Sequence, residues 1–267
     1  MVRQPAVAGQ FYTDNPHQLR AELQRLVISS GEKERPLGVI SPHAGYMYSG
    51  AVAGALYGAI EVPATVIILG PNHHGIGHRA ALSPAEQWQT PLGVVPVNSI
   101  LSTLVRHHAL LVEEDVTAHL YEHSLEVQVP FLQHVRPDVS IVPLCLGFGD
   151  FESCRALGEG IAAAIREYDD EVLIVASSDM THYESATAAL RKDQHALDAV
   201  LAIDPPGLLR VCHQESITMC GVVPATVMLV AALSLGATRA RLVRYATSGD
   251  VTGDNRQVVA YAALTVT

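Results

Sequence analysis

The stretch TVIILGPNHHG, from Thr65 to Gly75, decides the fold class of this chain. Its first half is an unbroken β-branched and apolar run, which is typical of a strand that is buried on both faces of a parallel sheet. Gly-Pro-Asn ends the run, and His73 and His74 follow immediately. In open α/β sheets, ligands bind just beyond the carboxyl ends of the strands. The stretch therefore predicts a buried strand that delivers polar side chains to a ligand site.

Further strands and helices alternate along the rest of the chain. The other short segments rich in Val, Ile and Leu are Leu37–Ser41, Gly93–Val97, Ser140–Cys145, Glu171–Ala176, Arg241–Ala246 and Val258–Val266. The segments with helical periodicity are His17–Val27, Phe151–Glu167, Ala186–Ile203 and Gly221–Leu235. We find no repeat and no linker, and we interpret DPPG (Asp204–Gly207) as a turn. The alternation predicts a single α/β domain over residues 1–267, with a mostly parallel central sheet flanked by helices.

The segment Leu125–His134 fits two patterns. Leu125, Val129 and Leu132 would lie on one face of a helix, whereas every second residue from Leu125 to Phe131 is apolar, as in a strand. Pro130 is unfavourable inside a helix. Ser124 is a suitable N-cap residue, so we expect a helix.

Composition and charge exclude some classes of partner and cellular location. The chain has 267 residues, of which 49% are hydrophobic, so a sizeable core is feasible. The formal net charge is −10 and Lys and Arg form no block, which argues against nucleic acid or an anionic membrane as a partner. The first residues lack the apolar region of a signal peptide, and four cysteines show no CxxC spacing. We therefore expect a cytoplasmic protein with reduced thiols.

One uncharged segment, Ser216–Thr238, is long enough to cross a bilayer. Pro224 falls where the first turn of a helix would be, and Gly236 stands where a residue ending that helix would be. Seryl and threonyl residues interrupt the apolar run. We expect a buried helix of a soluble α/β protein here and no membrane association.

Three strand ends carry the same kind of polar group. His43 follows Leu37–Ser41, His73 follows the apolar run Thr65–Leu69, and Asp179 and His182 follow Glu171–Ala176. A single histidine after a strand is usually an ordinary loop residue. The repetition at three strands favours a shared site, because the carboxyl ends of neighbouring parallel strands meet at one edge.

Two further groups are candidates for the same site. Cys220 precedes the apolar helix Gly221–Leu235, and a helix start favours a thiolate that could bind a metal or act as a nucleophile. A buried cysteine that serves only as a small apolar residue is the alternative. Glu122, His123 and Glu126 are crowded together. They are either helix-capping residues or carboxylates that hold a metal-bound histidine in one tautomer.

Six motifs together resemble the Memo family, called AmmeMemoRadiSam system protein B in bacteria and archaea. In chain order they are RQPAVAGQFY, SPHAGYMYSG, GPNHHG, EHSLEVQVPFL, SSDMTHY and MCG, and they extend from Arg3 to Gly221. The resemblance implies a fold similar to that of class III, LigB-like extradiol dioxygenases. Those enzymes hold non-haem iron with two histidines and a carboxylate, and use a further histidine as acid and base.

The resemblance also implies roles for individual residues. The metal ligands would be His43, His73 and Cys220, with His182 as the acid/base and Asp179 beside it in the cleft. The residues implied to line the cleft or support the ligands are His74, His123, Glu126 and Tyr46.

Cys220 replaces the carboxylate of the dioxygenases and makes the ligand set softer, so copper and zinc suit it as well as iron. We expect iron or copper, an oxidoreductase-type site of the dioxygenase kind and an unidentified small-molecule substrate. Two alternatives stay open: an adaptor that binds phosphopeptides or other anions in the cleft, and a metal-free hydrolase using Cys220, His182 and Asp179. The name of the bacterial system further implies a pathway shared with radical-SAM and AMMECR-type proteins.

Overall fold

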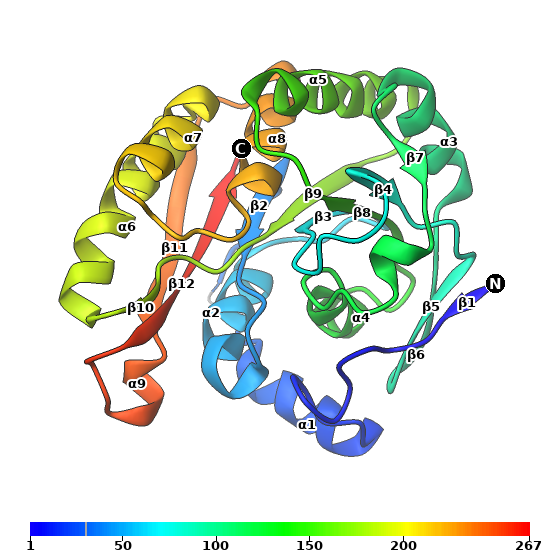
Figure 1. Cartoon of the computed structure of the whole chain (residues 1–267). Helices are drawn as coiled ribbons and strands as arrows, with labels where there is room; N and C mark the ends of the chain where they lie inside the picture. Colours follow the sequence, from blue (N-terminus) through cyan, green and yellow to red (C-terminus); the bar gives the residue numbers. More distant parts are fainter. Residues whose placement is uncertain (30) are drawn as a thin grey trace.

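Four parallel strands form the centre of the main sheet in the computed structural model, which describes residues 1–29 and 31–267 (Figure 1). Their order across the sheet is β2 (Gly38–Ser41), β9 (Val172–Ser177), β3 (Thr65–Pro71) and β8 (Ser140–Leu146). Three of these strands are buried along their whole length, and β8 is buried beyond its first residue. The parallel, doubly covered strands predicted from the apolar runs are therefore present.

Antiparallel strands extend this centre on both sides, so the whole sheet is mixed. On the β2 side, β12 (Val258–Val266) pairs antiparallel with β2, and both β10 (His182–Glu184) and β11 (Ala240–Thr247) pair antiparallel with β12. On the β8 side, β4 (Ala80–Leu82) is antiparallel to β8, and β7 (Glu113–Glu114) runs parallel to β4. The mostly parallel arrangement holds for the centre of the sheet.

Helices cover both faces of the sheet (Figure 1). The helices packed in one of the two cores are α1 (Pro16–Leu26), α2 (Tyr46–Ala59) and α4 (Val129–Val135). Those packed in the other are α3 (Ser99–His108), α5 (Phe151–Glu167), α6 (Ala186–Leu201), α7 (Pro205–Gln214) and α8 (Val222–Ser234). A short α9 (Gly249–Thr252) follows β11. Successive residues of β3 alternate between the cores: Ile67 packs in the second and Ile68 in the first.

Two sequence-based expectations need correction, and helix α2 was not predicted. The predicted strand at Gly93–Val97 forms as β6 (Gly93–Pro96), but it pairs with β5 (Gln87–Thr90) in a separate three-stranded sheet with β1 (Val2–Arg3). DPPG is the start of α7 and not only a turn: the Asp204 side chain accepts from the backbone N–H of Gly207, and prolines occupy the first turn. Helix α2 was missed because its sequence, YMYSGAVAGALYGA, lacks an amphipathic pattern.

The ambiguous segment Leu125–His134 divides into a 3-10 turn, η2 (Glu126–Gln128), followed directly by α4. Pro130 lies in the first turn of α4, where its missing N–H costs nothing. Ser124 does not cap this helix, because its hydroxyl donates to the carbonyl of Pro71 at 3.1 Å.

The uncharged segment folds as α8, with Pro224 in its first turn and Gly236 just beyond its end at φ 101°. Among residues 1–29 and 31–267, no helix has the length and apolar character needed to cross a bilayer.

Candidate metal centre

Three neighbouring strands deliver polar residues to one place. His43, Asp179 and His73 each lie two residues beyond the last residue of β2, β9 and β3, and these strands are adjacent and parallel. The backbone N–H of His43 donates to Asp179 Oδ1 at 2.8 Å, and the ring centroids of His43 and His73 are 5.2 Å apart. The convergence expected from the strand-end pattern is therefore observed.

A third imidazole completes the cluster. The His123 ring lies 4.5 Å from that of His73 and 5.4 Å from that of His43, measured between centroids. One ring nitrogen from each of these three histidines lies within 4.8 Å of those of the other two. His123 comes from the loop before η2, so strand periodicity alone does not place it here. Together the three side chains form a group that can hold a metal ion.

The ring of His73 is fixed by Glu122. Glu122 Oε1 lies 2.8 Å from His73 Nδ1, and Oε2 accepts from the His73 backbone N–H at 2.7 Å. A carboxylate only accepts, so the proton of the neutral ring sits on Nδ1 and Nε2 keeps its lone pair. Oε1 is also 3.5 Å from His123 Nδ1 and accepts from the Ser124 N–H at 2.9 Å. These contacts to a fully buried side chain hold the pKa of Glu122 well below its usual range despite desolvation.

The histidines fit the form that a metal requires. Burial is the main cause that lowers the pKa of His43 well below 6.5, and neighbouring histidines lower it further. Burial likewise lowers the pKa of His123 to about 4. Both rings are therefore neutral at pH 7, which is the protonation state of a metal-binding imidazole.

Cys220 lies against this cluster. Its Sγ is 3.2 Å from His43 Nε2 and receives the backbone N–H of Asp179 at 3.3 Å. The expectation of a thiolate at the helix start differs from the structure: burial, and next the Asp179 carboxylate, raise the pKa of the Cys220 thiol. Cys220 contacts His43 but is not one of the three residues whose ligand atoms all lie within 4.8 Å of one another. Without a bound cation it is a neutral thiol.

Asp179 and His182 both line the cleft, but they form hydrogen bonds with different neighbours. Asp179 accepts from the backbone of His43, and burial raises the pKa of its carboxyl to about 6. His182 is held by Thr218 instead: its backbone N–H donates to Thr218 Oγ1 at 2.8 Å, and its Nδ1 lies 3.1 Å from the Thr218 carbonyl. The Nδ1–H tautomer follows, with the lone pair on Nε2.

The other implied support residues stabilise the surrounding framework and do not line the cleft. Glu126, fully buried, accepts from the Arg3 guanidinium, the Tyr12 hydroxyl and two backbone N–H groups of the N-terminal segment. The Tyr46 hydroxyl donates to the Val127 carbonyl at 2.8 Å. The exposed His74 bonds the Tyr121 carbonyl through Nε2 at 3.0 Å, which ties the GPNHHG loop to the segment before Glu122.

The histidine cluster opens into a cleft of about 780 Å³. Four aromatic side chains form part of its wall: Phe11, Tyr48, Tyr183 and Tyr261. Tyr183 has φ 59°, an uncommon conformation for a residue with a large side chain and one found at functional sites. The described lining residues include Asp179 and Asp254 but neither Lys nor Arg.

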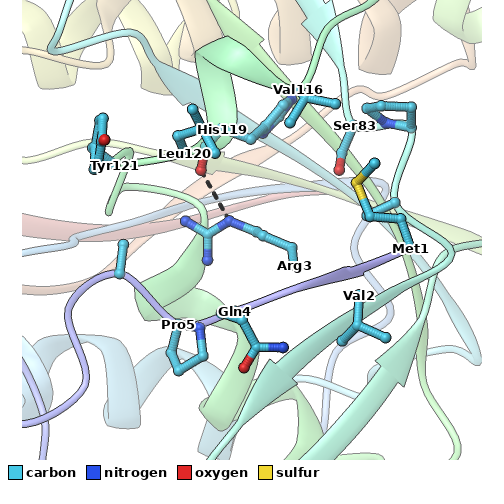
Figure 2. A pocket seen from close by; sticks show the side chains of 13 residues that line it. Met1, Val2, Arg3, Gln4, Pro5, Ser83, Val116, His119, Leu120 and Tyr121 are labelled. Atoms are coloured by element: carbon cyan, nitrogen blue, oxygen red, sulfur yellow. Dashed lines mark hydrogen bonds between the residues drawn. The ribbon is translucent and has the colours of Figure 1, made fainter.

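A second, mainly apolar cavity of about 400 Å³ lies between the N-terminal segment and the loop that carries His119 to Tyr121 (Figure 2). Arg3 is at its wall and donates from Nε to the His119 carbonyl at 3.0 Å. The same guanidinium donates to the Glu122 carbonyl at 2.8 Å. Arg3 therefore fixes the backbone that precedes His123, and the cavity beside it is separate from the histidine cluster.

The fold and the cluster define an α/β protein with a candidate three-histidine metal site at the carboxyl ends of its central strands. The chain belongs to the Memo family: the family model described as Memo-like protein matches residues 3–265. MEMO1 family proteins of Methanopyrus kandleri and Aquifex aeolicus are 40% and 42% identical, each over 98% or more of both chains. The crystal structure of an uncharacterized protein from Escherichia coli K12 has a TM-score of 0.57 at 14% identity. It covers 86% of this chain and 100% of its own, and it shows a similar fold.

Sequence reasoning missed two supports of this site. Ser177 lies at the end of β9 and contacts His43, and Thr218 precedes Cys220 and orients His182. Serine and threonine are common at strand and helix ends, so residue type alone did not single out either one, although Ser177 is the first residue of the SSDMTHY motif. The crowding of Glu122 beside His123 was the signal for the carboxylate that holds His73.

Proposed function

We propose that this Memo-family protein binds iron or copper in the histidine cluster and carries out redox chemistry on a small molecule in the adjoining cleft. The observation that carries the proposal is the convergence of His43, His73 and His123, three imidazoles from three separate segments. An iron or copper ion held by these residues would supply Lewis acidity and one-electron chemistry beside the cleft. Zinc also suits the nitrogen ligands and would restrict the site to Lewis-acid chemistry.

The residues around the cluster have separable tasks in this proposal. His43 and His73 present Nε2 lone pairs whose direction is set by hydrogen bonds at Nδ1. His182 lines the cleft, and in its Nδ1–H tautomer the Nε2 lone pair can accept a proton there and return it, which is the role of an acid/base group. Asp179 holds the His43 backbone and lies on the same wall.

The third ligand is the point at which the resemblance and the geometry differ. The resemblance assigns Cys220, and the geometry groups His123 with the other two histidines. We keep Cys220 in the proposed ligand set because its Sγ contacts His43 Nε2, so one ion between these groups would reach both atoms. Deprotonation of the thiol would accompany metal binding, since a thiolate is the ligand form.

Elemental mass spectrometry on untagged, anaerobically purified protein tests the proposal. The wild type should contain near-stoichiometric iron or copper, and His43→Gln should lose it. Cys220→Ser and His123→Gln then separate the two candidates for the third ligand, since the true ligand variant loses more metal. A wild-type protein that neither retains nor takes up metal would overturn the proposal.

The two alternatives have less support. A phosphopeptide or anion site normally uses arginine or lysine, and the described cleft lining contains neither. A cysteine hydrolase needs a thiol with a lowered pKa, whereas burial raises that of Cys220. In the described part of the chain, Asp179 is also not hydrogen-bonded to the His182 ring, which the Thr218 carbonyl holds instead.

A further inference from the structure

A chain of buried polar side chains lies behind His43, on the side away from Cys220. His43 Nδ1 is 3.0 Å from the hydroxyl of Ser177, the last residue of β9. Ser177 contacts the Gln128 amide, which in turn contacts the Tyr57 hydroxyl. Ser177 and Gln128 are fully buried, so each polar atom needs a partner of the correct kind.

Backbone carbonyls fix the direction of every hydrogen bond in this chain. Gln128 Nε2 lies 2.9 Å from the Pro42 carbonyl, which can only accept, so this atom is the NH2 group of the amide. The same NH2 group therefore donates its other hydrogen to Ser177 Oγ at 2.8 Å, and Gln128 Oε1 accepts from the Tyr57 hydroxyl at 2.9 Å.

The single hydroxyl proton of Ser177 is also assigned. Ser177 Oγ lies 2.6 Å from the Ser124 carbonyl, and only donation by Ser177 satisfies this contact. Because its proton is used there and one lone pair accepts from Gln128, Oγ can only accept at its remaining position. His43 must therefore donate, and its ring proton is on Nδ1.

We propose that Ser177, itself oriented by Gln128 and Ser124, is a positioning residue that fixes the Nδ1–H tautomer of His43. This leaves the Nε2 lone pair facing Cys220 and the histidine cluster. The inference rests on the proposed metal site for its consequence, although the tautomer itself exists without metal. The opposite tautomer would direct an N–H group at the ion and could not coordinate it. A neutral hydroxyl thus does for His43 what the Glu122 carboxylate does for His73.

Long-range ¹H–¹⁵N NMR of the metal-free, histidine-labelled protein tests the tautomer directly. The His43 signals are identified by their absence from the spectrum of a His43→Gln variant. In the wild type the spectrum should show Nδ1 protonated and Nε2 unprotonated at pH 7. An Nε2–H tautomer or a mixture of the two would overturn the proposal, whether or not the protein binds metal.

Metal titration of Ser177→Ala tests the consequence, with Co²⁺ and Zn²⁺ as the probes. Loss of a hydrogen-bond partner behind a metal-bound histidine lowers affinity by about 10- to 100-fold, and we expect a loss of this size together with a mixed His43 tautomer. The matched control is Ser83→Ala, which removes a buried hydroxyl that accepts from the Trp88 indole N–H at 3.1 Å, away from the cluster. It should leave both the affinity and the tautomer unchanged.

The outcomes separate this inference from the proposed function. A wild-type protein with the Nδ1–H tautomer but no affinity for any metal would contradict the proposed function and leave the tautomer assignment standing. Metal binding that is equal in the wild type and Ser177→Ala would overturn the positioning role. If Ser177→Ala does not fold, the wild-type spectrum still decides the tautomer.

Discussion

Glu122 Oε1 lies 2.8 Å from Nδ1 of His73, while Oε2 of the same carboxylate accepts from the His73 backbone N–H at 2.7 Å. One buried side chain therefore fixes both the ring and the main chain of a candidate metal ligand. Its backbone is in turn held by Arg3, which comes from the N-terminal segment. This relationship couples the candidate site to a part of the chain far away in sequence.

Replacement of Glu122 by glutamine should weaken metal binding without removing a ligand. An amide has one accepting oxygen, so its NH2 group would face either the His73 ring N–H or the backbone N–H. We expect affinity to fall by about 10- to 100-fold, as is typical for a lost partner of a metal-bound histidine. Competition titration against a chromophoric chelator measures it. Glu114→Gln, an exposed residue paired with Arg106, is the control, and equal affinities in the two variants would contradict the role of Glu122.

Removal of the Glu126 carboxylate should strongly destabilise the fold. Glu126→Ala would leave the Arg3 guanidinium, only 9% exposed as a residue, without its carboxylate partner. Breaking a buried ion pair from one side typically costs about 3–5 kcal/mol. Urea denaturation measures the free energy of unfolding. Glu61→Ala, which breaks the exposed pair with Arg35, should cost no more than about 1 kcal/mol.

His119 should make the protein sensitive to acid. Burial lowers the pKa of His119 from 6.5 to about 4, and its Nδ1 has no hydrogen-bond partner among the described residues. The unfolded chain therefore binds a proton between these values and the folded chain does not. The contribution of the neutral His119 ring to the free energy of unfolding is fully present above pH 6.5. It is lost as the pH falls towards 4, and the loss is about 3 kcal/mol in total.

Denaturation of a His119→Gln variant across this pH range measures that contribution. The variant should lose less stability on acidification than the wild type, whatever its stability at neutral pH. His43 and His123 remain in both proteins and supply a common background of acid sensitivity. Identical pH slopes in the two proteins would show that His119 does not contribute.

Gly54→Ala should destabilise the protein, although alanine normally favours an exposed helix by about 1 kcal/mol over glycine. A Cβ at Gly54 would lie 2.3 Å from the carbonyl oxygen of Leu26, so α2 would have to move away from the last residue of α1. We expect a lower midpoint in thermal denaturation, since the clash is with backbone and not with a flexible side chain. A raised midpoint would show that the two segments separate freely.

The sequence by itself determined the central strands and the residues at their carboxyl ends. An apolar run without alternation specifies a strand buried on both faces, and this local property identified β2, β3, β8 and β9. Because parallel neighbours share one edge, the positions of His43, His73 and Asp179 after such runs were enough to predict that they meet. The resemblance to the Memo family then implied roles for individual residues, which the spacing of those residues alone does not indicate.

Tertiary structure decided which side chains share the site and which face away. His123 joins the cluster, whereas Glu126 binds Arg3, because the turn at Ser124 and Leu125 directs the two side chains to different neighbours. The antiparallel edges of the sheet likewise depend on pairing between segments that are distant in sequence. Helix α2 depends on long-range packing too, because Gly54 allows it to approach Leu26 closely and no local sequence pattern indicates that contact. The tautomers of His43 and His182 are fixed by Ser177 and Thr218, whose contacts cross from one element to another. Local sequence sets the secondary-structure preference of each segment. The chemistry of the site is set by hydrogen-bond partners that only folding brings together.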